Sequence, residues 1–255
     1  MLVVENVNKS FGGVKALRDI SLRVEKGSLI GLIGPNGSGK STLFNVITGV
    51  LSKDTGNITF KGKRIDHLPP HNIAAMGISR TFQVPQISRR MTVLENMLLA
   101  PMGQIGDNPI RVFVNWKAWR NQDRTLAERA EEILELVGLI RQSDELAGSL
   151  AGGQLKLLSL AVALMNDGEL LMLDEPTAGV DLALTDQIMG YLIQAHGQGK
   201  TLLIVEHRMR VISGICQYVY VLDAGEVIAR GEPSEIQNNP QVIEAYLGSK
   251  KKVKV

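Results

Sequence analysis

Short apolar runs separated by glycine-containing turns make up the first part of the chain. Apolar and β-branched residues gather at positions 2–7, 20–24 and 57–60, a pattern that predicts strands. Glycine pairs and Lys-Gly pairs lie between these runs. Because short strands alternate with tight turns, we expect an antiparallel β layer within residues 1–65.

A different pattern interrupts this layer at residues 29–33, Leu-Ile-Gly-Leu-Ile, which carry no polar side chain. The run predicts a buried strand. A glycine-rich stretch follows it, and a helix is expected over residues 40–50. This part of the chain therefore predicts a strand, a loop and a helix in direct succession.

Helical spacing characterises residues 85–166, which we expect to form an inserted helical subdomain. A glycine at position 138 stands where a C-terminal helix cap belongs. The apolar positions that recur at this spacing are Leu126, Ala130, Ile133, Leu134 and Val137.

Strand and helix patterns alternate after residue 166. Helical segments separate the apolar runs, so we expect an α/β core with a mainly parallel sheet. A turn at residues 223–226 then starts a hairpin. The predicted strands cover residues 170–173, 201–205 and 218–222, and the predicted helices cover residues 182–196 and 208–214.

Composition narrows the class of protein. The net charge of +2 does not favour nucleic-acid binding, and the single cysteine, Cys216, excludes an internal disulfide. The start of the chain lacks a signal-peptide pattern, and no run reaches the roughly 18 apolar residues that span a bilayer. We therefore expect a cytoplasmic protein, with one domain over residues 1–249. The basic tail at 250–255 is expected to be disordered or to contact anionic lipid headgroups.

The stretch GPNGSGKST, residues 34–42, carries the first chemistry. Its spacing, Gly34-x-x-x-x-Gly39-Lys40-Ser41, between a strand and a helix is typical of a phosphate-binding loop. Glycines let successive backbone N–H groups face phosphate oxygens, and the helix start adds a positive dipole. Lys40 is expected to reach the β- and γ-phosphates, and the Ser41 hydroxyl is expected to bind Mg²⁺.

Two acidic residues end the apolar run 170–173 and supply the second half of a nucleotide site. Asp174 stands at the carboxyl end of the predicted strand, where it is expected to hold magnesium through water. Glu175 follows it and is expected to polarise an attacking water. A phosphate-binding loop joined to such a strand predicts a P-loop NTPase core.

A second glycine pair precedes a second helix, within Leu-Ala-Gly-Gly-Gln at residues 150–154. An apolar helical segment follows over residues 155–165. This start of a helix offers a second possible anion site, more than a hundred residues from Lys40.

Taken in order, these motifs resemble the ATPase subunit of an ATP-binding cassette (ABC) transporter over nearly the whole chain. The resemblance implies catalytic roles for Glu175, His207 and Gln83, and metal contacts for Ser41, Gln83 and Asp174. It implies nucleotide contacts for Phe11, Gly34, Pro35, Asn36, Gly37, Ser38, Gly39, Lys40, Ser41, Thr42, Ala151, Gly152, Gly153, Gln154 and Asp181.

The chemistry of these side chains agrees with the implied roles. Phe11 offers a flat apolar face to adenine, and the neutral amide of Gln83 can sense magnesium and water. His207 can donate a hydrogen bond to the γ-phosphate. Ala151 departs from the family, which usually has serine at this position. Because alanine has no hydroxyl to donate to phosphate, we expect the ATP site that includes Ala151 to be weakened.

Less constrained stretches resemble a narrower group, the ATPases of branched-chain amino-acid importers. These stretches are RTFQ, MTVLENMLLA, VEHRM and NNPQVIEAYLG. The implied cofactors are ATP and Mg²⁺. The implied partners are permease subunits, a second cassette that is identical or paralogous, and indirectly an extracytoplasmic binding protein, with the chain on the inner face of the membrane. Urea uptake, a soluble ABC ATPase and a small-molecule kinase are the alternatives.

Overall fold

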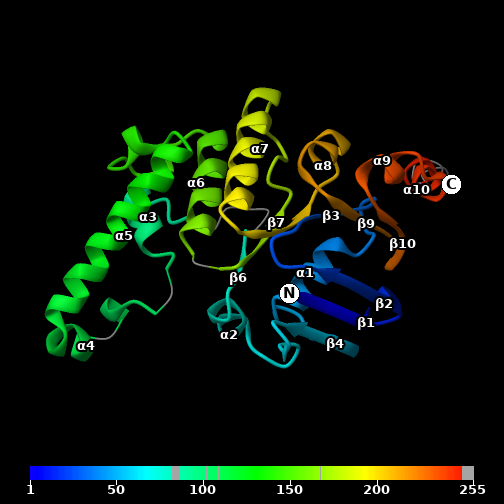
Figure 1. Ribbon diagram of the computed structural model, residues 1–255, viewed down its shortest axis with the longest axis horizontal. Helices are drawn as coiled ribbons and strands as arrows, with labels where there is room; N and C mark the ends of the chain where they lie inside the picture. The colour runs from blue at the N-terminus through cyan, green and yellow to red at the C-terminus, as the bar shows by residue number, and fades with distance from the viewer. Residues whose placement is uncertain (82–86, 102, 108, 167, 249–255) are drawn as a thin grey trace. The chain divides into compact units, whose positions relative to one another are not determined.

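The computed structural model describes residues 1–81, 87–101, 103–107, 109–166 and 168–248. The chain divides into two compact units. One comprises Met1–Arg80 and Gly168–Val255, and the other comprises Thr81–Asp167. We call them the sheet unit and the helical unit, and Figure 1 labels their elements.

The sheet unit contains two sheets. A six-stranded sheet has the order β10-β9-β3-β8-β7-β6, and a four-stranded sheet has the order β2-β1-β4-β5. The strands are β1 (Leu2–Phe11), β2 (Val14–Val24), β3 (Leu29–Ile33), β4 (Thr55–Phe60), β5 (Lys63–Arg64), β6 (Ile78–Arg80), β7 (Leu170–Asp174), β8 (Thr201–Val205), β9 (Tyr218–Asp223) and β10 (Glu226–Gly231). Its helices are α1 (Lys40–Ile47), α2 (Pro70–Ala75), α7 (Leu182–Gly197), α8 (Met209–Ile215), α9 (Pro233–Gln237) and α10 (Pro240–Gly248).

Parallel pairing places the functional ends of several strands at one edge of the larger sheet. Strand β3 pairs in parallel with β8 and β9, and β7 pairs in parallel with β6 and β8. Strand β10 pairs antiparallel with β9 at the edge of this sheet. The carboxyl ends of β3, β6, β7, β8 and β9 therefore meet at one edge, where open α/β sheets bind ligands.

The smaller sheet is antiparallel, as predicted from residues 1–65. Its strands are longer than the expected runs, because β1 and β2 continue to the two-glycine turn after Phe11. Helix α1 is shorter than expected and ends at Ile47, since Gly49 takes a left-handed conformation with φ 72°. Such a backbone favours glycine and stops a helix.

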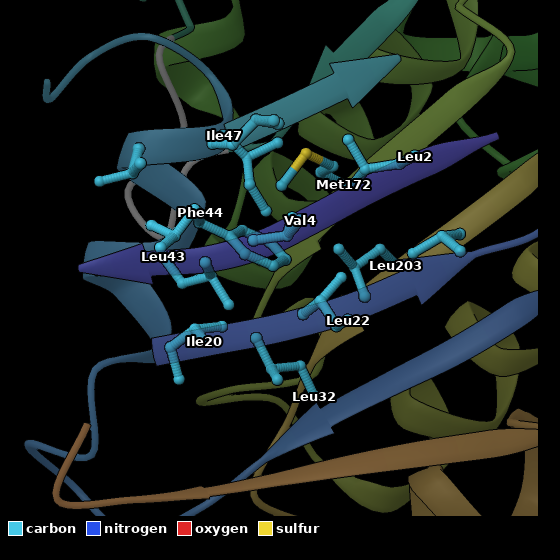
Figure 2. Packing of buried hydrophobic residues seen from close by; sticks show 14 of the residues in the cluster. Leu2, Val4, Ile20, Leu22, Leu32, Leu43, Phe44, Ile47, Met172 and Leu203 are labelled. Atoms are coloured by element: carbon cyan, nitrogen blue, oxygen red, sulfur yellow. The ribbon is translucent and has the colours of Figure 1, made fainter. Parts of the chain in front are cut away.

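The core of the sheet unit lies between the two sheets and α1. Figure 2 shows Leu2 and Val4 of β1 with Leu43 and Phe44 of α1, and side chains of the larger sheet lie beside them. Both Phe44 and Leu43 are fully buried. Burying an aliphatic or aromatic side chain of this size contributes about 1.5–3 kcal/mol. The helix that starts at Lys40 is thus fixed firmly against both sheets.

The helical unit is built around one long helix, α5 (Trp116–Leu136), which packs on α3 and α6. Ala130 and Leu134 of α5 are buried, as the apolar spacing predicted. A capping box between Thr92 and Glu95 starts α3. The other elements are α3 (Val93–Leu98), α4 (Pro109–Val114), α6 (Gly152–Met165) and the short 3₁₀ turns Ile105–Asp107, Ile140–Gln142 and Ala147–Ser149.

None of the helices in the described part of the chain is both long enough and apolar enough to cross a membrane. The basic tail at 250–255 lies outside the described residues.

Candidate functional site

The glycine-rich loop joins the end of β3 to the start of α1, as the motif requires. A Cβ atom on Gly34 would lie 2.0 Å from the carbonyl oxygen of Leu222, and one on Gly39 would lie 2.7 Å from that of Ala16. Both glycines also have positive φ values, 152° and 105°. Steric contact and backbone conformation therefore both demand glycine at the two ends of this loop.

The turn between β9 and β10 supports the loop from behind. The backbone N–H of Gly225 donates to the carbonyl of Ser38 over 3.1 Å, and the N–H of Arg18 donates to Gly225 over 2.7 Å. The loop is thereby tied to the hairpin and to β2. Such bracing holds backbone N–H groups in place before a ligand binds.

Lys40 is buried and its ammonium binds the loop to which it belongs. Its Nζ donates to the carbonyl oxygens of Gly34 and Pro35, each over 2.9 Å. Burial lowers the pKa of Lys40, while the negative charges of Glu175 and Asp174 oppose that shift. The loop follows β3 and both carboxylates stand at the end of β7, so they lie at the same edge of the parallel sheet.

Asp174 ends β7 and is only 6% exposed. The guanidinium of Arg80, at the end of the neighbouring strand β6, donates to its Oδ2 over 3.1 Å. Carboxylate and hydroxyl oxygens are the donors that Mg²⁺ prefers. Asp174 and the exposed Ser41 hydroxyl therefore fit a magnesium ion that keeps waters and substrate phosphates as its other ligands.

A protein-only metal cage is absent from the described residues, which contain no group of three or more His, Cys, Asp or Glu side chains placed to hold a metal.

Glu175 has an unusual backbone for a glutamate, with φ 49°. Its N–H donates to the carbonyl of Val205 over 2.9 Å, which pins the residue to the end of β8. Left-handed conformations of this kind cost of order 1–3 kcal/mol and gather at functional sites. His207 lies nearby, half-exposed, with its Nδ1 3.9 Å from Oε1 of Glu175.

Glu206 is a residue of this site to which the motifs assign no role. Its side chain is fully buried and accepts hydrogen bonds from the N–H and hydroxyl of Thr177 and from the N–H of His207. It therefore ties the segment after Glu175 to the segment that carries His207. A charged residue directly after an apolar strand was the only signal in the sequence.

Phe11 ends β1 beside the two-glycine turn, and its side chain is 48% exposed. The ammonium of Lys9 lies 5.5 Å from the ring centroid, and Lys9 in turn pairs with Asp54. An exposed aromatic ring is suited to stacking with a base.

Asp181 caps α7, since its Oδ1 accepts the N–H of Leu184 over 2.8 Å. The structure thus shows a local role for a residue whose expected contact is with nucleotide. Gln83, the other residue expected near magnesium, lies outside the described residues.

The second glycine pair belongs to the helical unit and starts α6, one turn earlier than the apolar run 155–165 indicated. Ala151 is the N-cap residue and has no side-chain oxygen to accept a backbone N–H. Gln154 completes the return half of a capping box, because its Oε1 accepts the N–H of Ala151 over 3.0 Å. The first N–H groups of α6 therefore lack the cap that serine would supply.

Comparison with known proteins gives two family matches. Residues 17–178 match the family described as ABC transporter, and residues 226–252 match the branched-chain amino acid ATP-binding cassette transporter family.

Curated relatives match over nearly the full length. A probable branched-chain amino acid transport ATP-binding protein LivG of Archaeoglobus fulgidus is 43% identical over 98% of this chain and 96% of its own. The high-affinity protein of that name from Escherichia coli is 36% identical over 97% of this chain and 98% of its own.

Solved structures agree with the sequence relatives. An ATP-binding cassette of an ABC transporter, in its ADP conformation, has a TM-score of 0.83 and 40% identity, and covers 97% of this chain and 98% of its own. These matches confirm the expected α/β P-loop fold and the expected ATPase class. The chain belongs to the ABC transporter family.

Proposed function

We propose that this chain binds and hydrolyses ATP to drive an importer of amino acids, of which branched-chain or other neutral amino acids are the best candidates. The supporting observation is its similarity, over nearly the whole chain, to relatives named as branched-chain amino acid transport ATP-binding proteins. The arrangement of Lys40, Asp174 and Glu175 at one sheet edge supplies the chemistry.

The loop would bind the phosphates of ATP in three ways. Backbone N–H groups within residues 36–39 would donate to the phosphate oxygens, and the dipole of α1 would stabilise their charge. The ammonium of Lys40 would exchange the carbonyls of Gly34 and Pro35 for phosphate oxygens. Phe11 would stack with the adenine.

Hydrolysis would depend on the residues at the ends of β7 and β8. Ser41, Asp174 and Gln83 would hold magnesium, which neutralises phosphate charge when bound. Glu175 would orient the attacking water and accept its proton. His207 would donate a hydrogen bond to the γ-phosphate, and Glu206 would hold His207 and Glu175 at a fixed spacing.

The proposed partners follow from the family. Two cassettes would face each other head to tail, so that ATP lies between the phosphate-binding loop of one and residues 151–154 of the other. Permease subunits would hold the chain on the inner face of the membrane, and an extracytoplasmic binding protein would deliver the substrate.

Urea uptake and a soluble ABC ATPase are less well supported than amino-acid import. The segment 226–252 matches the family of branched-chain amino acid ATP-binding cassette transporters. The names of the relatives given above also specify branched-chain amino acids. A small-molecule kinase has no use for the glycine pair that starts α6.

An uptake assay tests the proposal. The chain would be co-purified with its permease subunits and any second cassette, and reconstituted in proteoliposomes with the binding protein. We expect ATP-dependent accumulation of radiolabelled leucine, with Glu175→Gln as the inactive control. Transport of urea in place of leucine, or no association with membrane subunits, would contradict the proposed substrate or the proposed role.

A further inference from the structure

Arg80 is a buried arginine whose contacts converge on the proposed magnesium site. Its side chain is 8% exposed. The guanidinium reaches across from β6 to Asp174 of β7, and it also donates to Oδ1 of Asn45 over 2.6 Å and to Oγ1 of Thr48 over 3.2 Å. It lies over the ring of Phe44, 5.6 Å from the centroid.

These contacts fix the charge in one position. Asn45 belongs to α1 and Thr48 is the residue that ends it, while Phe44 of the same helix covers a face of the guanidinium. A planar fork held by several acceptors loses less rotamer freedom per bond than a flexible ammonium would. These contacts therefore hold the positive charge of Arg80 beside Asp174.

The pair has a clear energetic reason in the absence of metal. Asp174 is buried, and an isolated buried carboxylate is costly unless a counter-charge is present. Once a divalent cation binds the same carboxylate, two positive charges share one negative partner, and they repel each other. Arg80 should thus stabilise the metal-free site more than the metal-bound one.

We propose that Arg80 is the resident counter-ion of Asp174, which holds the carboxylate in place without metal and weakens the binding of Mg²⁺ when nucleotide is present. The inference rests on the proposed function, which places Mg²⁺ at Asp174. In this role Arg80 is a positioning residue: it touches the metal-binding carboxylate and helix α1. It would favour release of the metal together with the spent nucleotide.

The first experiment compares metal binding in Arg80→Gln with that in the native chain. Calorimetry would give the dissociation constant of ADP in EDTA and at saturating MgCl₂. The constant in EDTA divided by the constant at saturating MgCl₂ measures how strongly Mg²⁺ strengthens the binding of ADP. General damage to the pocket affects both constants alike and cancels in this ratio. We expect the ratio in Arg80→Gln to be about tenfold larger than in the native chain, because removal of the charge relieves repulsion.

Two further variants separate charge from packing. Arg80→Lys keeps the charge but loses the planar fork, so its ratio should lie closer to the native value than that of Arg80→Gln does. Arg129→Gln makes the same change at a partly buried arginine of the helical unit, which donates to the carbonyl of Leu164, and should not alter the ratio. An unchanged or smaller ratio in Arg80→Gln, or an equal shift in Arg80→Lys, would overturn the inference.

A stability measurement keeps the test decisive if Arg80→Gln folds poorly. In urea unfolding with EDTA and no nucleotide, we expect Asp174→Asn to restore much of the stability lost in Arg80→Gln, because the double variant buries no unpaired charge. Absence of any recovery would show that lost packing is the cause, and would contradict the counter-ion role. A native chain that shows no Mg²⁺ effect on ADP binding would instead refute the proposed metal site.

Discussion

At the scale of single residues, Lys40 and Glu206 are two buried ionisable side chains of the site that are satisfied in different ways. Lys40 donates hydrogen bonds to backbone carbonyls, and the charges of nearby carboxylates oppose the lowering of its pKa. Glu206 is fully buried and makes specific hydrogen bonds to two segments of the chain. The first arrangement can exchange partners when a ligand arrives, whereas the second is structural.

Lys40→Met should separate ligand binding from stability. Loss of a charge aimed at phosphate is expected to weaken ATP binding at least about tenfold. The free energy of unfolding should stay within about 1 kcal/mol of the native value, because the variant also removes the cost of burying an ammonium. Calorimetry and urea unfolding measure the two effects, with the exposed Lys63→Met as a control. Unchanged ATP affinity would contradict the assignment.

Glu206→Ala should instead damage the fold. The substitution leaves the N–H groups of Thr177 and His207 without their acceptor, so the free energy of unfolding is expected to fall by about 3–5 kcal/mol. Glu206→Gln keeps one acceptor oxygen and should lose less. Urea unfolding checks both variants against the exposed Glu5→Ala. A loss below about 1 kcal/mol would show that water replaces the carboxylate.

At the scale of elements, the starts and ends of helices decide how the site is built. Helix α1 begins with a lysine that closes the phosphate loop, and α6 follows an alanine whose side chain cannot cap the helix. Helix α10, at the other end of the chain, brings a buried tyrosine hydroxyl into the sheet unit.

Ala151→Ser tests the uncapped start of α6. A serine hydroxyl in the assembled transporter could donate to phosphate, and one hydrogen bond to a charged group is worth roughly 1.5–3 kcal/mol, or about ten- to a hundredfold in rate if felt only in the transition state. We expect at least a several-fold higher ATPase rate. The same hydroxyl should also stabilise the helix by about 1 kcal/mol as an N-cap.

Ala151→Asp separates the two effects of that change. Aspartate caps a helix as well as serine does, but its charge repels phosphate. It should therefore raise stability in urea without raising the ATPase rate. A rate change of less than about twofold in Ala151→Ser, well below the value of a lost bond to a charged group, would show that the hydroxyl is dispensable here.

Tyr246→Phe tests the buried hydroxyl of α10, which lies near the backbone of Gly34 but makes no hydrogen bond of good geometry to any residue that the structure describes. Burial raises the pKa of Tyr246, and the backbone of Gly34 only partly opposes that shift. Removing an unsatisfied hydroxyl should leave the free energy of unfolding unchanged or raise it by up to about 1 kcal/mol.

The pH dependence of this variant has a definite sign. Because the folded pKa is raised, the hydroxyl stays protonated in the native state while the unfolded chain ionises above about pH 10. The native chain should therefore lose stability relative to Tyr246→Phe as the pH rises beyond that value. Urea unfolding at about pH 8 and pH 11 measures the difference, and an equal advantage at both would contradict it.

At the scale of the whole molecule, the sequence predicted elements and motifs better than it predicted which of them lie side by side in the fold. Residues 29–33, 201–205 and 218–222 were expected as strands, and the structure has β3, β8 and β9 at or within one residue of those positions. Apolar periodicity and glycine spacing are local properties, so a sequence carries them directly.

Contacts between distant strands could not be predicted in the same way. Arg80 and Asp174 are 94 positions apart, and their contact depends on β6 pairing with β7 at the edge of the sheet. The strand β6 is only three residues long and carries a serine and an arginine, so its pattern gave no signal. The buried role of Glu206 likewise depends on the segment that contains Thr177, 29 positions away.

The most direct test of the account is a comparison of ATP binding and ATP turnover in Glu175→Gln. The glutamine keeps the shape of the side chain and leaves Lys40, Asp174 and the phosphate loop intact, but it cannot accept the proton of the attacking water. We expect the variant to bind ATP with an affinity close to that of the native chain, and the rate of hydrolysis in the assembled transporter to fall by about a hundredfold or more. Near-native hydrolysis in Glu175→Gln would show that the carboxylate at the end of β7 does not carry the reaction.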